Sequence, residues 1–401
     1  MRILLVSDYA TPTGGAETAL FTLQDGLRRY GHEVRMLASS AQPEATRNAA
    51  DYRCFGTLGR ARTLVQACNP TAFFALRRAL GDFCPDVVHV GLFLTQLSPL
   101  ILPVLRRVPT LYQVHWLRPI CPIGTKLRPD GQDCPTPPGT ICYRAGCIPL
   151  RDSVPLALQM TLWRRWSAAF NVIVANSEWT RQRLVAEGVP ASTVIWIGVP
   201  SRAPRPPLSD PPTVGFAGRL VHEKGVEVLV RAFARVRRQI PHARLVIAGD
   251  GPERHRIDAT IASFEIEDSV VLLGRQERES LEHHLDAAWV QAVPSLWHEP
   301  FGLVAAEAMM RGTAVVASAV GGLAEVVQDK QSGILVPPGD ERALAEGLVR
   351  ILSNRETAEE MGGLGRVFAQ RQLSDDVYVR RFIACYDALL QSASLSTRSM
   401  R

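Results

Sequence analysis

The sequence has no hydrophobic run that favours a membrane span and no large excess of charge of either sign. Residues 87–105 hold no Lys, Arg, Asp or Glu, but they include His89, Gln96 and two prolines, so we predict a buried strand followed by a short helix. At the amino terminus only four consecutive apolar residues precede Ser7 and Asp8, which predicts a strand rather than a signal peptide. With no export signal, the eight cysteines point to a reducing cytoplasm.

The composition is that of an ordinary globular protein. Of the 401 residues, 46% are hydrophobic and 21% are charged, a balance that excludes a disordered or fibrous chain. This length favours two domains. A formal net charge of +6 suits anionic ligands or an anionic membrane surface, but it is small for a nucleic-acid-binding protein, so we expect no nucleic acid among the partners.

Apolar segments of strand length alternate with segments of helical periodicity, which predicts parallel sheets covered on both faces by helices. The predicted strands are ILLVSD, EVRMLAS, DVVHV, TLYQVHW, NVIVANS and TVIWIG, and then TVGFAGR, ARLVIAGD, SVVLLGR, AWVQAVPS, TAVVASAV and GILVPP. Six prolines in residues 199–212 forbid a helix there and predict a semi-rigid linker. We therefore expect one domain over residues 1–198, a second over residues 213–372, and a final helix in residues 373–401 that crosses back to the first.

Two short motifs have features that suit an anionic ligand. Gly14 and Gly15 precede a helix, whose free amides and dipole attract phosphate, although a tight turn alone would explain them and the G-x-G-x-x-G spacing is absent. In GFAGRLVHEKG, Arg219 ends a strand and Lys224 precedes the next helix, so this pair could hold a diphosphate. The alternative is that both cations are solvated surface charges.

The segment SLWHEPFGLVAAEAMMRG places a carboxylate on each side of a predicted helix start. The amides at the tip of this helix would suit a phosphate, and they belong to Phe301, Gly302, Leu303 and Val304. Glu299 could accept hydrogen bonds from sugar hydroxyls, and Glu307 could bind a ribose diol. The alternative is a helix cap at Glu299 and a solvated Glu307.

Together these motifs match a known family. The pattern E-x7-E with an interposed F-G-L, preceded by G-R-x4-K-G, resembles the retaining, nucleotide-sugar-dependent glycosyltransferases of family 4, which have the GT-B fold. Further similar segments are GGAE, VIAGDGP at residues 246–252, SEWTRQRL at residues 177–184, and residues 321–340. The resemblance implies an α/β chain with two Rossmann-like, doubly wound domains that face each other across a cleft.

The resemblance also implies roles for the residues of the second domain. Arg219 and Lys224 would neutralise the leaving diphosphate in place of a divalent metal. Glu299 would contact the donor sugar, and Glu307 would bind the ribose hydroxyls. The base would be read by the backbone near three consecutive residues, which are Gly274, Arg275 and Gln276.

In the first domain, the resemblance implies that Gly14 and Gly15 close over the phosphate and that His115, at the end of a strand, contacts the donor sugar. A merely packed or surface-exposed histidine is the alternative for His115. The expected activity is retaining transfer of a sugar from a nucleotide-sugar, a UDP-sugar before GDP-mannose, to a hydroxyl of a glycan, a lipid-linked glycan or a natural product, without a cofactor. The alternatives are a nucleotide-sugar epimerase of the same fold and an inactive sugar-nucleotide-binding subunit.

Four of the eight cysteines fall within one Pro- and Gly-rich loop, residues 117–150. They are Cys121, Cys134, Cys142 and Cys147, with the spacing C-x12-C-x7-C-x4-C. Four thiolates could fix such a loop around a structural zinc ion or an iron–sulfur cluster. Free thiols or two disulfides are the alternatives.

One segment raises the prospect of peripheral contact with the inner face of a membrane. In LWRRWSAAF, residues 162–170, Trp163 and Trp166 flank Arg164 and Arg165, a combination that suits an anionic membrane surface. A helix that packs through its tryptophans and exposes its arginines is the alternative. The expected location is therefore the cytoplasm, either free or peripheral to the membrane.

Overall fold

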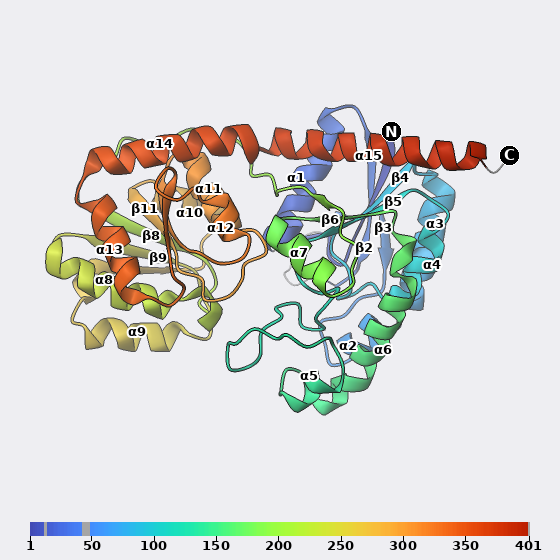
Figure 1. The fold of residues 1–401 in the computed structure, drawn as a ribbon, viewed down its shortest axis with the longest axis horizontal. Coiled ribbons are helices and arrows are strands. Elements are labelled where there is room, and N and C mark those ends of the chain that lie inside the picture. The colour runs from blue at the N-terminus through green and yellow to red at the C-terminus, as the bar shows by residue number, and fades with distance from the viewer. Residues whose placement is uncertain (12–13, 42–48, 400–401) are drawn as a thin grey trace. The chain divides into compact units, whose positions relative to one another are not determined.

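The computed structural model describes residues 1–11, 14–41 and 49–399, and the chain divides into two compact units (Figure 1). Unit 1 comprises Met1–Gly198 together with Asp375–Arg401, and unit 2 comprises Val199–Ser374. Each unit is an α/β domain built on one parallel sheet, as the alternation of strand and helix segments predicts.

The sheet of unit 1 has the strand order β3-β2-β1-β4-β5-β6-β7, and all of its neighbouring strands are parallel. The strands are β1 (Arg2–Ser7), β2 (Glu33–Ser39), β3 (Tyr52–Cys54), β4 (Val87–Val90), β5 (Thr110–Val114), β6 (Val172–Ala175) and β7 (Thr193–Val194). The register pairs Ile3 with Val34 on one side and with Val87 on the other. Every residue of β4 and β5 is buried, which requires cover on both faces of the sheet.

The helices of unit 1 are α1 (Gly15–Arg29), α2 (Arg62–Ala67), α3 (Pro70–Phe83), α4 (Leu102–Leu105), α5 (Thr140–Arg144), α6 (Leu150–Trp166), α7 (Glu178–Ala186) and α15 (Asp375–Ser399). Helix α15 belongs to the same core as the sheet because Tyr378, Phe382 and Tyr386, one helical turn apart, are fully buried. The hydroxyl of Tyr386 lies 2.6 Å from Nδ1 of His89 on β4, and Gln113 Nε2 donates to the Tyr378 hydroxyl at 3.0 Å.

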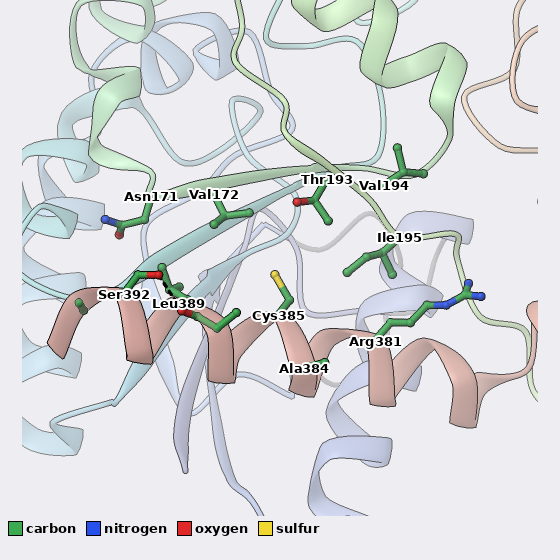
Figure 2. Close-up of a pocket in the computed structure, with 12 residues that line it drawn as sticks. Asn171, Val172, Thr193, Val194, Ile195, Arg381, Ala384, Cys385, Leu389 and Ser392 are labelled. Carbon is green, nitrogen blue, oxygen red and sulfur yellow. Dashed lines mark hydrogen bonds between the residues drawn. The ribbon is translucent and has the colours of Figure 1, made fainter. Parts of the chain in front are cut away.

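A mainly apolar groove of about 750 Å³ lies in unit 1 between α15 and the edge of the sheet at β6 and β7. Figure 2 shows Cys385 and Leu389 of α15 facing Val172 and Ile195 across this space. None of the residues predicted to bind or react with a ligand lines the groove.

The sheet of unit 2 has the strand order β10-β9-β8-β11-β12-β13, again with parallel neighbours throughout. Its strands are β8 (Thr213–Ala217), β9 (Arg244–Ala248), β10 (Val270–Gly274), β11 (Ala288–Val293), β12 (Ala314–Ser318) and β13 (Gly333–Val336). Its helices are α8 (Val226–Gln239), α9 (Arg254–Ser263), α10 (Arg278–Leu285), α11 (Leu303–Arg311), α12 (Leu323–Val326), α13 (Glu341–Leu352) and α14 (Arg355–Gln372). In each sheet the strand order reverses at the first strand, β1 or β8. Open α/β sheets bind ligands at the carboxyl ends of the strands beside such a reversal.

The proline-rich segment 199–212, predicted to be a linker, packs onto unit 2. Leu208 is buried in the core of that unit, and the Arg205 guanidinium lies 2.9 Å from the carboxylate of Glu359. The indole of Trp289 donates to the Ser209 carbonyl oxygen at 2.9 Å. The prolines forbid a helix, yet they leave these side chains and carbonyls available for packing.

The segment 162–170 lies at the end of α6. Trp163 is only 1% exposed and belongs to an aromatic cluster with Phe93, Tyr112 and Phe170, whereas Arg164 and Arg165 are exposed. The structure therefore agrees with the alternative, a helix that packs through a tryptophan and exposes its arginines. Contact of these arginines with a membrane stays a prediction. Among the helices in the described part of the chain, none has the length and apolar character to cross a bilayer.

Candidate functional site

Two loops of unit 2 bring a cation and a carboxylate together at the carboxyl ends of adjacent strands. Lys224 follows β8 and ends a short 3₁₀ helix (His222–Lys224), and Glu299 follows β11. The Lys224 ammonium lies 2.8 Å from Oε1 of Glu299 and 5.8 Å from the centre of the Trp297 ring. The Lys224 side chain is 20% exposed and that of Glu299 is 9% exposed, so the pair is largely withdrawn from water.

Glu299 is held as a carboxylate in spite of its burial. Burial by itself would raise the pKa of Glu299, but the Lys224 charge and the hydrogen bonds from Lys224 and Ser295 outweigh it, and the pKa lies below its ordinary value. Ser295 donates its hydroxyl to the same Oε1 that Lys224 contacts. A buried anion of this kind can accept hydrogen bonds from a polar ligand through its remaining lone pairs.

The backbone of the loop that carries Glu299 is in close contact with two neighbouring loops. Gly321, after β12, has φ +52°, and a Cβ there would overlap the carbonyl oxygen of Glu299; the next amide, of Gly322, donates to that oxygen at 2.8 Å. On the other side, the Leu296 amide donates to the Glu223 carbonyl at 2.9 Å. Glu299 is thus fixed through its backbone as well as through its side chain.

The amino terminus of α11 lies immediately after Glu299. Gly302 has φ +103° and caps the helix, and no side chain in the described part of the chain caps it by a hydrogen bond. The amides that begin a helix have no partner within it, so those of Leu303 and Val304 offer donors and a partial positive charge. Phe301, directly before this turn, is 3% exposed. The arrangement would suit an anion, and the binding of a phosphate by Phe301, Gly302, Leu303 and Val304 stays a prediction.

The other two charged residues of the predicted set, Arg219 and Glu307, are more exposed to solvent than Lys224 and Glu299. The Arg219 side chain is 70% exposed and lies 3.8 Å from the Glu223 carboxylate, a surface contact that contributes little to stability. Glu307, on α11, lies 3.2 Å from the Arg278 guanidinium. Burial raises the pKa of Glu307, while the charges of Arg278 and Arg311 oppose the rise. Glu307 is therefore not the freely solvated residue of the alternative reading.

The predicted base-reading segment follows β10. Gly274 has φ +66° and its carbonyl accepts from the Gly249 amide at 2.8 Å, which ties this loop to the end of β9. Arg275 is exposed, and the side chain of Gln276 bonds the Leu273 carbonyl at 2.7 Å and accepts from Ser280 at 2.8 Å.

The remaining predicted residues belong to unit 1. Gly14 is the N-cap of α1 and its carbonyl accepts from the Thr18 amide at 2.9 Å; Gly15 is the first residue of that helix. His115 directly follows β5 and is 7% exposed. Burial lowers the pKa of His115 to about 4, and neither ring nitrogen has a hydrogen-bond partner among the described residues. A buried imidazole with two unsatisfied nitrogens is suited to a polar ligand.

The four cysteines of the loop are not paired with one another in disulfides. Cys121 and Cys142 are buried, Cys134 and Cys147 are partly exposed, and all four thiols are free. Burial raises the pKa of Cys142, and neighbouring charge at Cys121 and Cys134 would raise it further. Within residues 1–11, 14–41 and 49–399, no three or more His, Cys, Asp or Glu side chains are arranged to hold a metal ion. The metal site therefore stays a prediction.

Several residues of these sites are not identified by the sequence motifs. Ser295 and Trp297 flank the Lys224–Glu299 pair, and only their position beside the first glutamate of E-x7-E could have suggested them. Arg118 follows His115 by three positions and is 5% exposed. A lone arginine in a loop carries no such signal, because its burial depends on contacts made far away in the sequence.

Two glycosyltransferase domain models together match most of the chain. The model of the Glycosyltransferase Family 4 domain matches residues 13–202, and that of Glycosyl transferases group 1 matches residues 201–367. An uncharacterized glycosyltransferase of Methanocaldococcus jannaschii is 40% identical over 139 residues, which span 35% of this chain and 35% of that relative. Alignment with the D-inositol 3-phosphate glycosyltransferase of Xylanimonas cellulosilytica covers 92% of this chain and 93% of that protein, at 29% identity.

Solved structures share the fold over nearly the whole chain. Sucrose-phosphate synthase from Thermosynechococcus elongatus superposes with a TM-score of 0.73 at 24% identity, covering 98% of this chain and 100% of that one. Anabaena HepE, solved in complex with UDP and glucose, superposes with a TM-score of 0.69 at 19% identity, covering 97% and 100%. The predicted GT-B fold class is thereby confirmed.

Proposed function

Because the chain belongs to the glycosyltransferases of family 4 and has the GT-B fold, we propose that it transfers a sugar from a nucleotide-sugar to a hydroxyl of an acceptor with retention of anomeric configuration. The observation that carries this proposal is the buried pair of Lys224 and Glu299 beside the uncapped start of α11. A cation, a carboxylate and free amides at the carboxyl ends of adjacent strands suit the diphosphate and the sugar of such a donor.

The proposed chemistry follows from where charge develops. When the bond between sugar and diphosphate breaks, the leaving group gains negative charge and the sugar becomes cation-like. Lys224, the exposed Arg219 and the first amides of α11 would stabilise the leaving group by preorganised electrostatics. No divalent metal is needed in this scheme, because side-chain cations and amides supply the positive charge.

Glu299 would orient the donor sugar rather than attack it. Its Oε1 already accepts from Lys224 and Ser295, so the other oxygen is the one placed to accept from sugar hydroxyls. We assign Glu307 to the ribose diol. Its contact with Arg278 at 3.2 Å would then be exchanged for, or shared with, the ribose. With no carboxylate assigned as a nucleophile, attack by the acceptor on the face that the diphosphate leaves is the proposed route to retention.

For the donor, we propose a UDP-sugar before GDP-mannose. The support is that Anabaena HepE, which shares the fold, was solved with UDP and glucose. The acceptor is proposed as a hydroxyl of a glycan, a lipid-linked glycan or a natural product. An epimerase is not favoured, because the family models and the full-length relative are all of glycosyltransferases.

A panel of nucleotides and nucleotide-sugars tests the proposal through thermal unfolding, since a ligand that binds only the folded state raises the melting temperature. We expect UDP and one UDP-sugar to raise it in the wild type and to do so much less in Lys224→Ala. A matched control is Lys330→Ala, which removes a lysine of unit 2 that lies in the turn before β13. A wild type that responds to none of these nucleotides, or a donor converted without an acceptor, would contradict the proposal.

A further inference from the structure

Arg118 is a buried cation without a carboxylate partner. Its residue is 5% exposed, and it forms no ion pair with any described acidic side chain within 4.0 Å. Its guanidinium lies over the Trp116 ring, 5.1 Å from the ring centre, and Nη1 donates to the Pro122 carbonyl. Nε of Arg118 and Nε1 of Trp116 are both buried without an acceptor in the described chain. Buried arginines are ordinarily paired, so these free donors need an explanation.

A second arginine, Arg62, lies close enough to Arg118 for its charge to affect the pKa of Arg118. Arg62, the first residue of α2, is partly buried, and its Nε also has no acceptor among the described residues. Burial lowers the pKa of Arg118 to about 10; the charge of Asp8 opposes that change, whereas the charge of Arg62 adds to it. The Tyr9 hydroxyl lies within the influence of both guanidiniums. The two guanidiniums thus repel each other, and the charge of Asp8 offsets part of that repulsion.

Asp8 cannot serve as their counter-ion through hydrogen bonds. Its Oδ1 accepts from the amides of Gln96 and Leu97, each at 2.7 Å, and its Oδ2 accepts from the amide of Thr95 at 2.9 Å and from the Thr95 hydroxyl. This carboxylate is fully buried and ties the loop after β1 to the loop after β4. Its lone pairs are already used, so the donors of Arg62 and Arg118 remain directed at something else.

We propose that Arg62 and Arg118 form an anion-binding subsite that holds a carboxylate or phosphate group of the acceptor. The subsite lies in the loops that follow the strands of unit 1, three residues from His115, and it uses the planar donor fork of arginine, which fits an oxyanion with two acceptor oxygens. This inference rests on the proposed function, because it assigns the anion to the acceptor and leaves the nucleotide to Lys224 and α11. It narrows the acceptor to one that carries a negative charge near the hydroxyl that receives the sugar.

The test measures anion binding by the full-length chain with three probes: inorganic phosphate, glucuronate and, as the neutral reference, glucose. We expect the wild type to bind phosphate or glucuronate and not glucose, and the stronger of the two anions identifies the source of the charge. Arg118→Gln and Arg62→Gln should each weaken binding about tenfold or more, the effect of losing a charge-assisted contact. Arg60→Gln, an exposed arginine two positions from Arg62, is the matched control and should bind as the wild type does.

Two further readouts keep the outcomes separate. Because Arg118 is buried without a counter-ion, Arg118→Gln should melt no lower than the wild type in the absence of anions, and Arg118→Lys, which keeps the charge but loses the fork, should bind more weakly than wild type. UDP binding should be the same in all of these variants. Unchanged anion affinity in both Gln variants would overturn the subsite. If the same variants also lost UDP binding, the two arginines would bind the donor instead of the acceptor, which would overturn the assignment. A wild type that binds anions but not UDP would instead defeat the proposed function.

Discussion

The ammonium of Lys224 lies 2.8 Å from the carboxylate of Glu299, although the two residues are 75 positions apart in the sequence. They come from the loops after β8 and β11, which are neighbours in the sheet of unit 2. The pair is mutually dependent, because each charge would be costly to bury without the other. Its position beside the start of α11 makes it the centre of the proposed donor site.

Removing either member of this pair should abolish most of the activity. We expect Glu299→Ala and Lys224→Ala each to lower sugar transfer by about 100-fold or more, comparable to the loss of one preorganised group in other active sites. Lys224→Ala should also destabilise the fold, because it leaves the buried Glu299 carboxylate without its counter-ion. Glu299→Gln should destabilise the fold less. Circular dichroism would confirm that the variants fold. Near-normal turnover in either alanine variant would remove the site assignment.

The backbone support of Glu299 can be tested at Gly321. An alanine there would have to adopt φ +52° and would collide with the Glu299 carbonyl, so Gly321→Ala should lower both stability and transfer. The matched control is Gly363→Ala on the exposed face of α14, where an added Cβ meets no atom within 4 Å. That variant should be more stable by about 0.5–1 kcal/mol, because alanine favours a helix over glycine. Equal effects of the two substitutions would show that Gly321 does not fix the loop.

The protein should lose stability in mild acid through His115. Burial lowers the pKa of His115 to about 4 in the folded chain, against about 6.5 when unfolded. Between these values the unfolded chain binds a proton that the folded chain does not, so the stability is complete above pH about 6.5 and falls as the pH drops toward 4. The loss amounts to about 3 kcal/mol.

Urea denaturation at pH 7 and pH 4.5 measures this effect. His115→Gln should show a smaller difference between the two conditions than the wild type, and replacement of the exposed His242 by Gln should leave the difference unchanged. His89, whose pKa burial lowers to about 3, contributes in the same direction and remains in both variants. An unaltered pH dependence in His115→Gln would mean that His115 is protonated in the folded chain.

Transfer should not require a divalent metal. Positive charge for the leaving diphosphate is available from Lys224, Arg219 and the amides of α11, and no Asp-x-Asp motif is placed to hold a metal against a diphosphate. Rates measured in excess EDTA should match those in buffer. Loss of activity that Mg²⁺ or Mn²⁺ restores would contradict the electrostatic scheme.

The four-cysteine loop has a separate test. Elemental analysis of protein purified without chelators should show about one zinc, or iron with sulfide, per chain, and replacement of Cys134 and Cys147 by serine should release it. Cys68 and Cys84, which are exposed and lie outside the loop, are the control pair. A metal-free, fully active protein with four titratable thiols in the loop would exclude the metal site.

Local pattern predicted most elements of the fold. Twelve predicted strands, from ILLVSD to GILVPP, correspond to β1, β2 and β4–β13, because each is a short apolar run; of TVIWIG, only Thr193–Val194 forms the strand β7. The exception is β3, Tyr52–Cys54, a three-residue edge strand whose sequence YRC has no such run. It forms only because β2 offers a free edge to pair with.

The motifs led to the prediction of a sugar-nucleotide site, which stays a prediction, and they did not indicate the contacts between its residues. Lys224 and Glu299 follow strands whose ends the local pattern marks, and Glu307 lies within the helix that begins after Glu299. Tertiary structure alone decided that Lys224 and Ser295 both contact Oε1 of Glu299, that the proline segment packs through Leu208, and that Nε of Arg62 and Nε of Arg118 are buried without an acceptor in the described chain. Element ends follow from local periodicity, whereas burial and charge pairing depend on which distant loops the sheet order brings together.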